Sequence, residues 1–158
     1  MKDLRAIAYT SKASRDLTPR DLDRLLLDAQ SFNKACDVSG VLLYHGGTFF
    51  QFFEGPETGV TAVYARIRQA TMHNVIVELL SAPASERQFA SWHMAFCEPP
   101  ESELQALETA SWEEAVPMTR TTYGRSEGLA LLLYYWSKWK AEPYPNNSVR
   151  SLPSTSAA

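Results

Sequence analysis

The stretch of sequence that decides the fold is VSGVLLYHGGTFFQFFEG, residues 38–55. Two apolar runs flank the dipeptide Gly46-Gly47, and glycine accepts the positive φ angles that a tight hairpin turn requires. The stretch therefore predicts two antiparallel strands, Val38–Tyr44 and Thr48–Glu54, joined at the glycines. The rest of the fold can be worked out from this hairpin in both directions along the chain.

On the N-terminal side of the hairpin, the sequence predicts a strand and a capped helix. The strand is Leu4–Ser11, in which the side chains alternate between two faces. A helix begins at Thr18, because a threonine cap, a proline at the first helical position and Asp21 three residues after the cap form a typical helix start. Apolar residues at helical spacing continue it to about Lys34, and this inward stripe ends in the polar residue Asn33.

On the C-terminal side, the pattern continues as helix, strand and strand. A second helix opens after Pro56, and strands are predicted at Val75–Leu80 and Ser91–Phe96, the latter with Trp92 and Met94 on one face. The order βαββαββ is that of the ferredoxin-like, split βαβ arrangement, an α+β fold. Right-handed crossovers place both helices on one face of the sheet, over central first and third strands. This leaves a groove between the helices where a flat ligand could bind.

The composition changes beyond the sheet region. Glu101–Glu114 is acidic and predicted to be partly helical, and Arg125–Lys140 is a second candidate helix that is apolar on most sides. We expect the second helix to cover the sheet face opposite the groove and to offer its excess apolar surface for self-association or a partner; complete burial within one monomer is the alternative. The predicted organisation is a sheet domain at residues 1–98, a helical extension at 99–142 and a flexible tail at 143–158.

The composition as a whole excludes several classes of protein. The 158 residues are 45% hydrophobic and 21% charged, with a formal net charge of -3, which favours one globular domain and gives no reason to expect nucleic-acid binding. Two cysteines are too few for a disulfide framework. The N-terminus lacks a signal-peptide core, and the longest apolar run, Leu129–Trp136, is far shorter than the roughly 20 residues that span a bilayer. We therefore expect a cytoplasmic protein with no membrane partner.

Three polar side chains are predicted to converge on the groove. Gln51 shares one face of its strand with Phe49 and Phe53, and a buried amide without a partner costs about 1–3 kcal/mol. Tyr9 lies on the neighbouring first strand within reach of Gln51, and Asn33 lies on the inward face of the first helix. For Gln51 alone the alternative is a structural amide satisfied by a neighbouring backbone, and for Tyr9 alone it is core packing; the three residues together favour a ligand site.

The remaining polar residues do not predict catalysis or a metal centre. The two cysteines and three histidines lack metal-ligand spacing, and the paired glycines form a turn rather than a phosphate loop. Glu54 and Glu57 lie where the second helix begins, so we expect their charges to favour the helix dipole rather than to act in acid–base catalysis.

These motifs resemble the BLUF domain, a sensor of blue light that uses flavin, over about Leu4 to Phe96. The matching pieces, in the order of the family, are Tyr9-Thr10-Ser11, Asn33, Val38-Ser39-Gly40-Val41-Leu42-Leu43-Tyr44, Gly47-Thr48-Phe49-Phe50-Gln51-Phe52-Phe53-Glu54-Gly55, Arg87-Gln88-Phe89 and Trp92-His93-Met94. The resemblance implies a noncovalently bound flavin, FAD by family precedent, with FMN as the alternative. It makes residues 1–98 the flavin-binding domain.

The resemblance also implies roles for individual residues. Tyr9 would be the photoactive electron donor, Gln51 the amide that switches between that tyrosine and the flavin, and Asn33 the side chain that holds the edge of the flavin ring. A phenol has a pKa of about 10 and is neutral at pH 7, but it becomes strongly acidic once it loses an electron. Gln51 could therefore take up the proton and end rotated or tautomerised, with a new hydrogen bond to the flavin that shifts its absorption to the red.

The other positions implied by the resemblance concern the relay and the cofactor wall. Trp92 and Met94 would relay the change from the fifth strand, and His73 would lie at the flavin site. Many members carry arginine just before that histidine, where this chain has Met72, so one polar contact to the flavin chain is expected to be missing.

The expected function is that of a photoreceptor without enzymatic activity. About 58 residues follow residue 100, which we take as too few for a cyclase or phosphodiesterase domain, so the expected output is a contact with an unknown protein partner or within a homo-oligomer. A flavin-dependent redox enzyme is the alternative, and it predicts bleaching by a nicotinamide donor. A ferredoxin-like interaction module would instead be colourless.

Overall fold

The structure is a computed structural model that describes residues 3–112 and 127–141. Within these residues the elements are β1 (Leu4–Ala13), α1 (Pro19–Ala35), β2 (Ser39–His45), β3 (Thr48–Pro56), α2 (Glu57–Gln69), β4 (His73–Ala84), β5 (Ala95–Cys97), α3 (Glu101–Thr109) and α4 (Glu127–Ala141). The predicted βαββαββ order with C-terminal helices is confirmed. The predicted tail at residues 143–158 lies outside the described residues, as do residues 113–114 and 125–126 of the predicted C-terminal helices.

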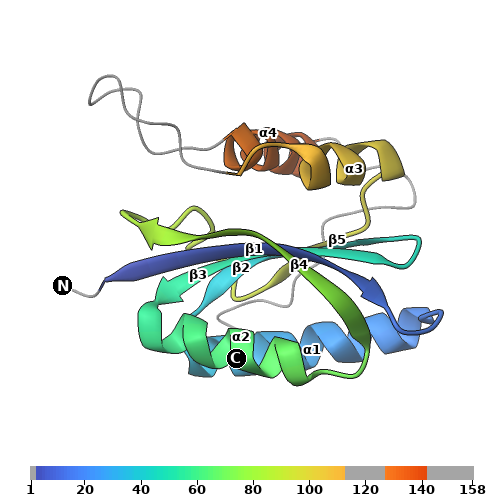
Figure 1. Ribbon diagram of the computed structural model, residues 1–158, viewed down its shortest axis with the longest axis horizontal. Helices are drawn as coiled ribbons and strands as arrows, with labels where there is room; N and C mark the ends of the chain where they lie inside the picture. Colours follow the sequence, from blue (N-terminus) through green and yellow to red (C-terminus); the bar gives the residue numbers. More distant parts are fainter. Residues whose placement is uncertain (1–2, 113–126, 142–158) are drawn as a thin grey trace.

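The strands form one sheet in the order β4-β1-β3-β2-β5. The central strands β1 and β3 are antiparallel, β4 and β2 pair antiparallel with them on either side, and β5 is added parallel to β2. Figure 1 shows α1 and α2 on one face of this sheet and α3 and α4 on the other. We call the face under α1 and α2 the pocket face, and the face under α3 and α4 the far face.

The hairpin that anchors the fold is present as predicted. Its turn residues Gly46 and Gly47 have φ angles of 53° and 86°, which glycine adopts without the steric penalty that a side chain would bring. The alternation expected in β1 also holds, since Ile7 and Tyr9 belong to the pocket-face core while Ala6 belongs to the far-face core. Both central strands are therefore covered on both sides.

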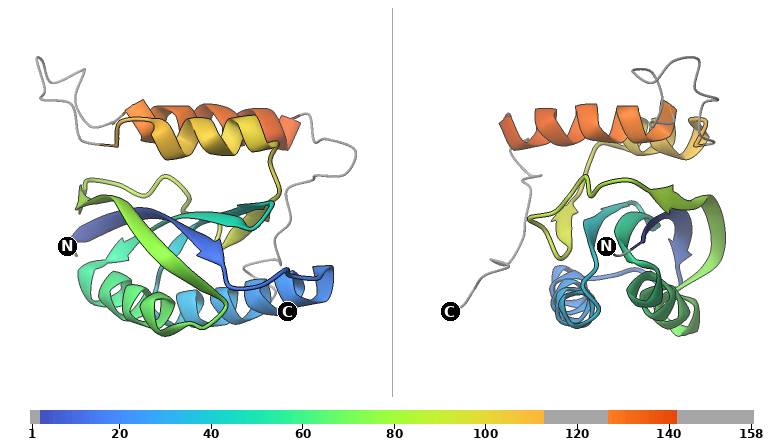
Figure 2. Two further views of the ribbon diagram at one scale, coloured as in Figure 1. Left: turned by 45° about the vertical axis from the view of Figure 1, so that its right-hand side comes forward. Right: turned by 90° about the vertical axis from the view of Figure 1, so that its left-hand side faces the viewer.

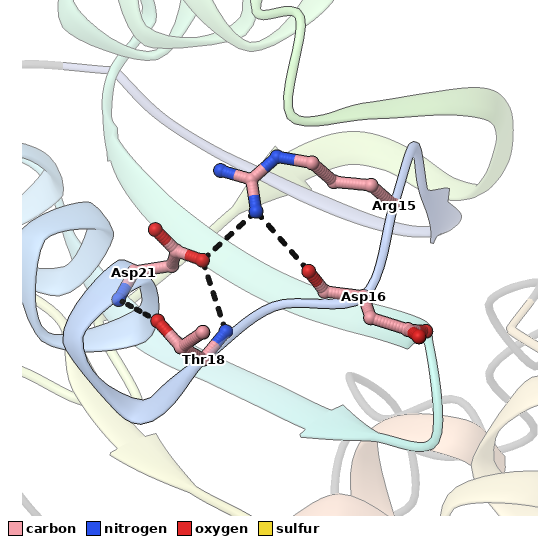
Figure 3. A network of polar contacts seen from close by, with 4 residues as sticks. All are labelled: Arg15, Asp16, Thr18 and Asp21. Atoms are coloured by element: carbon pink, nitrogen blue, oxygen red, sulfur yellow. Dashed lines mark hydrogen bonds and ion pairs between the residues drawn. The ribbon is translucent and has the colours of Figure 1, made fainter.

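The start of α1 is the predicted capping box (Figure 3). Thr18 Oγ1 accepts the backbone N–H of Asp21 at 3.1 Å, and the Asp21 carboxylate accepts that of Thr18 at 2.9 Å. Arg15 donates to the same carboxylate at 2.9 Å and to the carbonyl of Asp16 at 3.1 Å. The hydrogen bond from Arg15, helped by that from Thr18, lowers the pKa of Asp21. Helix start and preceding loop are thus held together at one point.

The C-terminal helices complete a second core on the far face. Phe50 and Phe52 point to this side, and their ring centroids lie 5.5 and 6.5 Å from that of Trp112. Trp136 and Trp139 of α4 are buried in the same cluster. Both views of Figure 2 show α3 and α4 lying across this face. The expectation that the last helix covers the face opposite the groove is therefore confirmed.

The region of the fifth strand differs from its prediction. The strand covers Ala95–Cys97 rather than Ser91–Phe96, because the residues before it turn and bend instead of extending. Trp92 and Met94 therefore do not share a face: Met94 belongs to the pocket-face core, whereas Trp92 packs against the far-face core. The alternation rule fails here because it holds only within an extended strand.

Candidate functional site

A cavity of about 280 Å³ opens between α1 and α2 on the pocket face. The buried side chains of Tyr9, Gln51 and Asn33 line its inner part. Its walls are mainly apolar and come from Leu25, Ala29, Phe32, Leu42, Phe49, Val63 and Ile67. The volume lies near the lower end of the range of roughly 300–1,000 Å³ that is typical of ligand sites. The groove predicted between the two helices is therefore present, and it carries the three predicted polar residues.

Tyr9 and Gln51 form the central contact of the cavity floor. They lie directly opposite each other in the β1–β3 pairing, and the Tyr9 hydroxyl donates a hydrogen bond of 2.5 Å to Gln51 Oε1. Burial, with a smaller contribution from Tyr64, raises the pKa of the Tyr9 phenol well above its usual value. The phenol is therefore neutral and acts as the donor, which directs the amide oxygen of Gln51 toward it.

The nitrogen end of the Gln51 amide faces Met94. Gln51 Nε2 lies 3.4 Å from Met94 Sδ, and both side chains are buried. A thioether sulfur is only a weak hydrogen-bond acceptor. The amide is thus held firmly at its oxygen and weakly at its nitrogen. Rotation of the amide would break only a weak contact at Nε2, while Oε1 would exchange Tyr9 for another partner.

Two side chains of α1 hold the backbone next to Met94. Asn33 Nδ2 donates to the carbonyl of His93 at 3.1 Å, and Gln30 Nε2 donates to the carbonyl of Met94 at 2.8 Å. Sequence reasoning singled out Asn33 but missed Gln30. The signal was present, because Leu22, Leu26 and Gln30 repeat every four residues along the buried stripe of α1.

His73 lines the cavity, but both of its ring nitrogens already have partners. Nδ1 lies 2.6 Å from Ser11 Oγ, and Nε2 lies 2.9 Å from the carbonyl oxygen of Ile67. A carbonyl can only accept, so Nε2 carries a proton and the serine hydroxyl can donate to Nδ1. The imidazole therefore serves as a fixed wall of the cavity, and its ring centroid lies 6.1 Å from that of Tyr9.

Trp92 lies away from the cavity. Its ring centroid is 5.6 Å from that of Trp136 on α4, with the ring planes nearly perpendicular at 88°. Its backbone carbonyl accepts the N–H of Gly40 at 2.9 Å. Met94 and Trp92, which sequence reasoning grouped together, therefore contact opposite sides of the sheet within three residues of chain.

Glu54 does not serve the helix dipole as expected from the sequence. Its side chain is 1% exposed, and Oε2 accepts the backbone N–H groups of Gln88 and Phe89 at 2.7 and 2.6 Å. Burial raises the pKa of Glu54 to about 7, against the lowering effect of these two hydrogen bonds and of the nearby Arg87. The prediction was wrong because strand alternation, which puts Glu54 on the same face as Phe52, decides its direction.

The outer part of the cavity is lined by charged side chains, with three arginines and two aspartates. Arg15, Arg24 and Arg66 line it together with Asp21 and Asp28, and all three arginines are exposed. Arg66 also lies over the ring of Phe32, with 4.6 Å between its Cζ and the ring centroid. Met72 lines the cavity as well and brings no charge there.

The residues of the cavity fit a flavin. The flavin ring is flat, its faces are apolar, and hydrogen-bonding atoms lie along one edge. The cavity offers apolar walls from two helices, and the amides of Gln51 and Asn33 lie at its inner end. The arginines at its outer part suit the phosphates of a flavin nucleotide. Fold and cavity together define a ferredoxin-like domain built to hold such a group.

The family follows from comparison with known proteins. A family model described as "BLUF: Sensors of blue-light using FAD" matches residues 4–95, more than half of the chain. The chain belongs to the BLUF family. It is therefore a blue-light photoreceptor domain that binds a flavin, and BLUF domains themselves are sensors rather than enzymes.

The related proteins are much longer than the matched region. The photoactivated adenylate cyclase subunit beta of Euglena longa is 34% identical over 90 residues, which cover 56% of this chain and 10% of that protein. The blue light- and temperature-regulated antirepressor BluF of Escherichia coli (strain K12) is 37% identical over 86 residues, which cover 54% of this chain and 21% of that protein.

Solved structures agree on the fold. The dark-state structure of the BLUF protein BlrB superposes with a TM-score of 0.60 at 26% identity, over 68% of this chain and 80% of that chain. The photo-activated state of BlsA gives a TM-score of 0.59 at 26% identity, over 66% of this chain and 76% of that chain.

Across residues 3–112 and 127–141, none of the helices has the length and apolar character needed to cross a membrane.

Proposed function

We propose that this chain senses blue light through noncovalently bound FAD, with Tyr9 as the donor of an electron and a proton and Gln51 as the hydrogen-bond switch. The observation that carries the proposal is the buried hydrogen bond from Tyr9 to Gln51 on the cavity floor, with Met94 on the other side of the amide. This arrangement joins a redox-active phenol to a group that can change partners by rotating.

The chemistry begins at Tyr9. A bound flavin supplies a light-excited ring that accepts an electron from a nearby phenol. Tyr9 is protonated beforehand, because burial raises its pKa. Loss of an electron makes the phenol strongly acidic, so its proton moves along the existing hydrogen bond to Gln51 Oε1. When the electron returns, Gln51 gives one proton back to Tyr9: a proton returned from Oε1 leaves the amide free to end rotated, and a proton returned from Nε2 leaves Gln51 as its tautomer.

The other cavity residues position the ring and the phosphates. Asn33 holds the ring edge through Oδ1 and through the second N–H of Nδ2, since the first is bonded to the carbonyl of His93. Arg15, Arg24 and Arg66 take the phosphates and supply the charge that Met72 lacks. The diphosphate of FAD carries its charge on two linked phosphates, so it can contact more than one of these arginines at once, and the family model is described as using FAD.

The signal leaves the cavity through the residues before β5. Gln51 contacts Met94, and Trp92 two residues earlier packs on Trp136 of α4. We take the output to be a changed contact of the C-terminal helices with a partner protein or with a second copy of the chain. One relative is named an antirepressor and another a cyclase subunit, which supports output through a neighbouring protein or domain.

An absorption spectrum before and after blue light tests the proposal. Purified protein supplied with FAD should be yellow, shift reversibly to the red under blue light and release intact FAD on denaturation. Tyr9→Phe and Gln51→Leu should both keep the flavin and lose the shift. A normal photocycle in the Gln51 variant would reject the switch, and bleaching by a nicotinamide donor would point to a redox enzyme instead.

A further inference from the structure

Glu54 is a buried carboxylate that the proposed light chemistry does not use. It lies on β3 three residues after Gln51, but it faces the opposite side of the sheet, and its neighbour across β1 is Ala6 of the far-face core. While Oε2 accepts two backbone N–H groups, Oε1 is buried and has no hydrogen-bond partner within the described residues. Burial of a carboxylate costs free energy, so the position of Glu54 requires a structural explanation.

The two N–H groups belong to the middle of the β4–β5 connection, residues 85–94. Further backbone hydrogen bonds hold the part of the connection that follows these residues. The carbonyl of Phe89 accepts the N–H of Trp92 at 3.0 Å, and the carbonyl of Trp92 accepts that of Gly40 at 2.9 Å. A side chain at Gly40 would place Cβ 2.0 Å from the carbonyl oxygen of Phe52, so the close approach of β2 to β3 at this position requires glycine.

The same connection contacts both Gln51 on the pocket face and the last helix. At its end, Met94 lies against Gln51. Nearer its middle, the rings of Phe89 and Trp92 lie edge-on to Trp136, with centroid distances of 5.8 and 5.6 Å. Strand β3 thus holds the connection at two places, through Gln51 on the pocket face and through Glu54 on the far face.

We propose that Glu54 is a positioning residue that fixes the middle of the β4–β5 connection to β3, so that a displacement begun at Met94 is passed to α4. This inference rests on the function proposed above. The backbone N–H groups of Gln88 and Phe89 are both bonded to one oxygen of Glu54, so the short span from Phe89 to Met94 pivots about this point and its displacement reaches Trp136. Without that fixed point, the connection absorbs the displacement by bending.

Hydrogen exchange of the full chain, with and without FAD, tests this role. In flavin-loaded protein, blue light should change the exchange of α4 amides in the wild type. Glu54→Leu keeps a similar volume but removes the acceptor, so it should retain the red shift and lose the light-dependent change in α4. Glu54→Gln keeps an oxygen that can accept both N–H groups, and should restore that change. Glu86→Gln, an exposed change in the same connection, is the matched control.

A dark measurement separates this inference from the photoreceptor proposal. In flavin-free protein, Glu54→Leu should speed the exchange of the amides of Gln88 and Phe89 roughly tenfold or more relative to the wild type and Glu86→Gln. Absence of a red shift in the wild type would reject the photoreceptor proposal. Unchanged dark exchange of the two amides in Glu54→Leu would reject the positioning role of Glu54. An unaltered light response of α4 in Glu54→Leu, or loss of its red shift, would overturn the proposed role. Should that variant not fold, slower dark exchange of both amides in the wild type than in Glu54→Gln is still required above pH 7, where Glu54 is ionised, because bonds to a charged acceptor are stronger.

Discussion

The two faces of the sheet share the same strands but are built for opposite purposes. The pocket face keeps a cavity of about 280 Å³ and buries polar side chains at its floor, among them Tyr9, Asn33 and Gln51. The far face is filled with aromatic and aliphatic side chains from β3, α3 and α4. A ligand site requires unfilled space and unsaturated polar groups, whereas stability requires close packing. The comparison indicates that the far face stabilises the sheet and leaves the pocket face free to bind.

Removal of the far-face cover should have the largest effect. Truncation after Pro100 exposes Phe50 and Phe52 and deletes Leu132, Trp136 and Trp139, each of which contributes about 1.5–3 kcal/mol by burial. The sum of these burial contributions is comparable with the net stability of a whole domain, which is about 5–15 kcal/mol. The truncated protein should aggregate or unfold in size-exclusion chromatography and thermal melting. A soluble, equally stable monomer would show that the helices neither cover the sheet nor mediate assembly.

A pair of single substitutions compares the faces directly. Trp136→Ala on the far face should lower the free energy of unfolding by about 3–5 kcal/mol, because it leaves a void in a closed core. Leu25→Ala on the cavity wall should cost about 1 kcal/mol in flavin-free protein, because this half-buried side chain borders open space. Urea unfolding of both variants measures the difference. Equal losses would mean that the cavity wall is as closely packed as the far face.

Met94 tests the place where the two faces communicate. Met94→Ala should preserve the red shift but remove the light-dependent change in α4, since the alanine no longer contacts the Gln51 amide. It should also lower the free energy of unfolding by about 2–5 kcal/mol, because Met94 is fully buried. Spectroscopy and hydrogen exchange on one sample separate the two effects. A loss of stability with the α4 response intact would assign Met94 to core packing alone.

The protonation of Glu54 predicts a pH dependence that comes from the far face. Its pKa is raised from 4.5 to about 7 in the folded protein, so the folded state binds the proton more tightly than the unfolded state. The resulting stability is present in full below pH 4.5 and is lost as the pH rises through 7, by on the order of 3 kcal/mol at most. Glu54→Gln should remove this fall in denaturant titrations between pH 4.5 and 8. An unchanged slope in the variant would assign the dependence to other groups.

A small change in stability is also expected on the cavity floor. Tyr9→Phe removes one buried hydrogen bond and should change the free energy of unfolding by about 0.5–1.5 kcal/mol, although it abolishes the red shift. Thermal melting and absorption spectra measure the two quantities. A loss as large as that of Trp136→Ala would mean that the floor supports the fold as much as the far face does.

The sequence by itself determined the regular part of the molecule. The paired glycines set the hairpin, the capping box set the start of α1, and alternation in β1 and β3 put Tyr9 and Gln51 on the pocket face of their own strands. These features depend on local φ angles and on side-chain periods, which neighbouring residues determine. Only the ends of elements differed, as in β4, which runs from His73 to Ala84 because β1 offers it a long pairing partner.

Only the tertiary structure decided the irregular segment that joins the faces. No local rule directs the side chains of residues 85–94, because they do not form a continuous strand. Met94 turns toward the pocket-face core and Trp92 toward α4 because distant groups hold the backbone of this segment, with Asn33 at the carbonyl of His93 and Gly40 at that of Trp92. Glu54 likewise acquires its role from two N–H groups more than 30 residues away. Contacts between residues so far apart in sequence form only when the whole chain folds, so no pattern within a short stretch contains them.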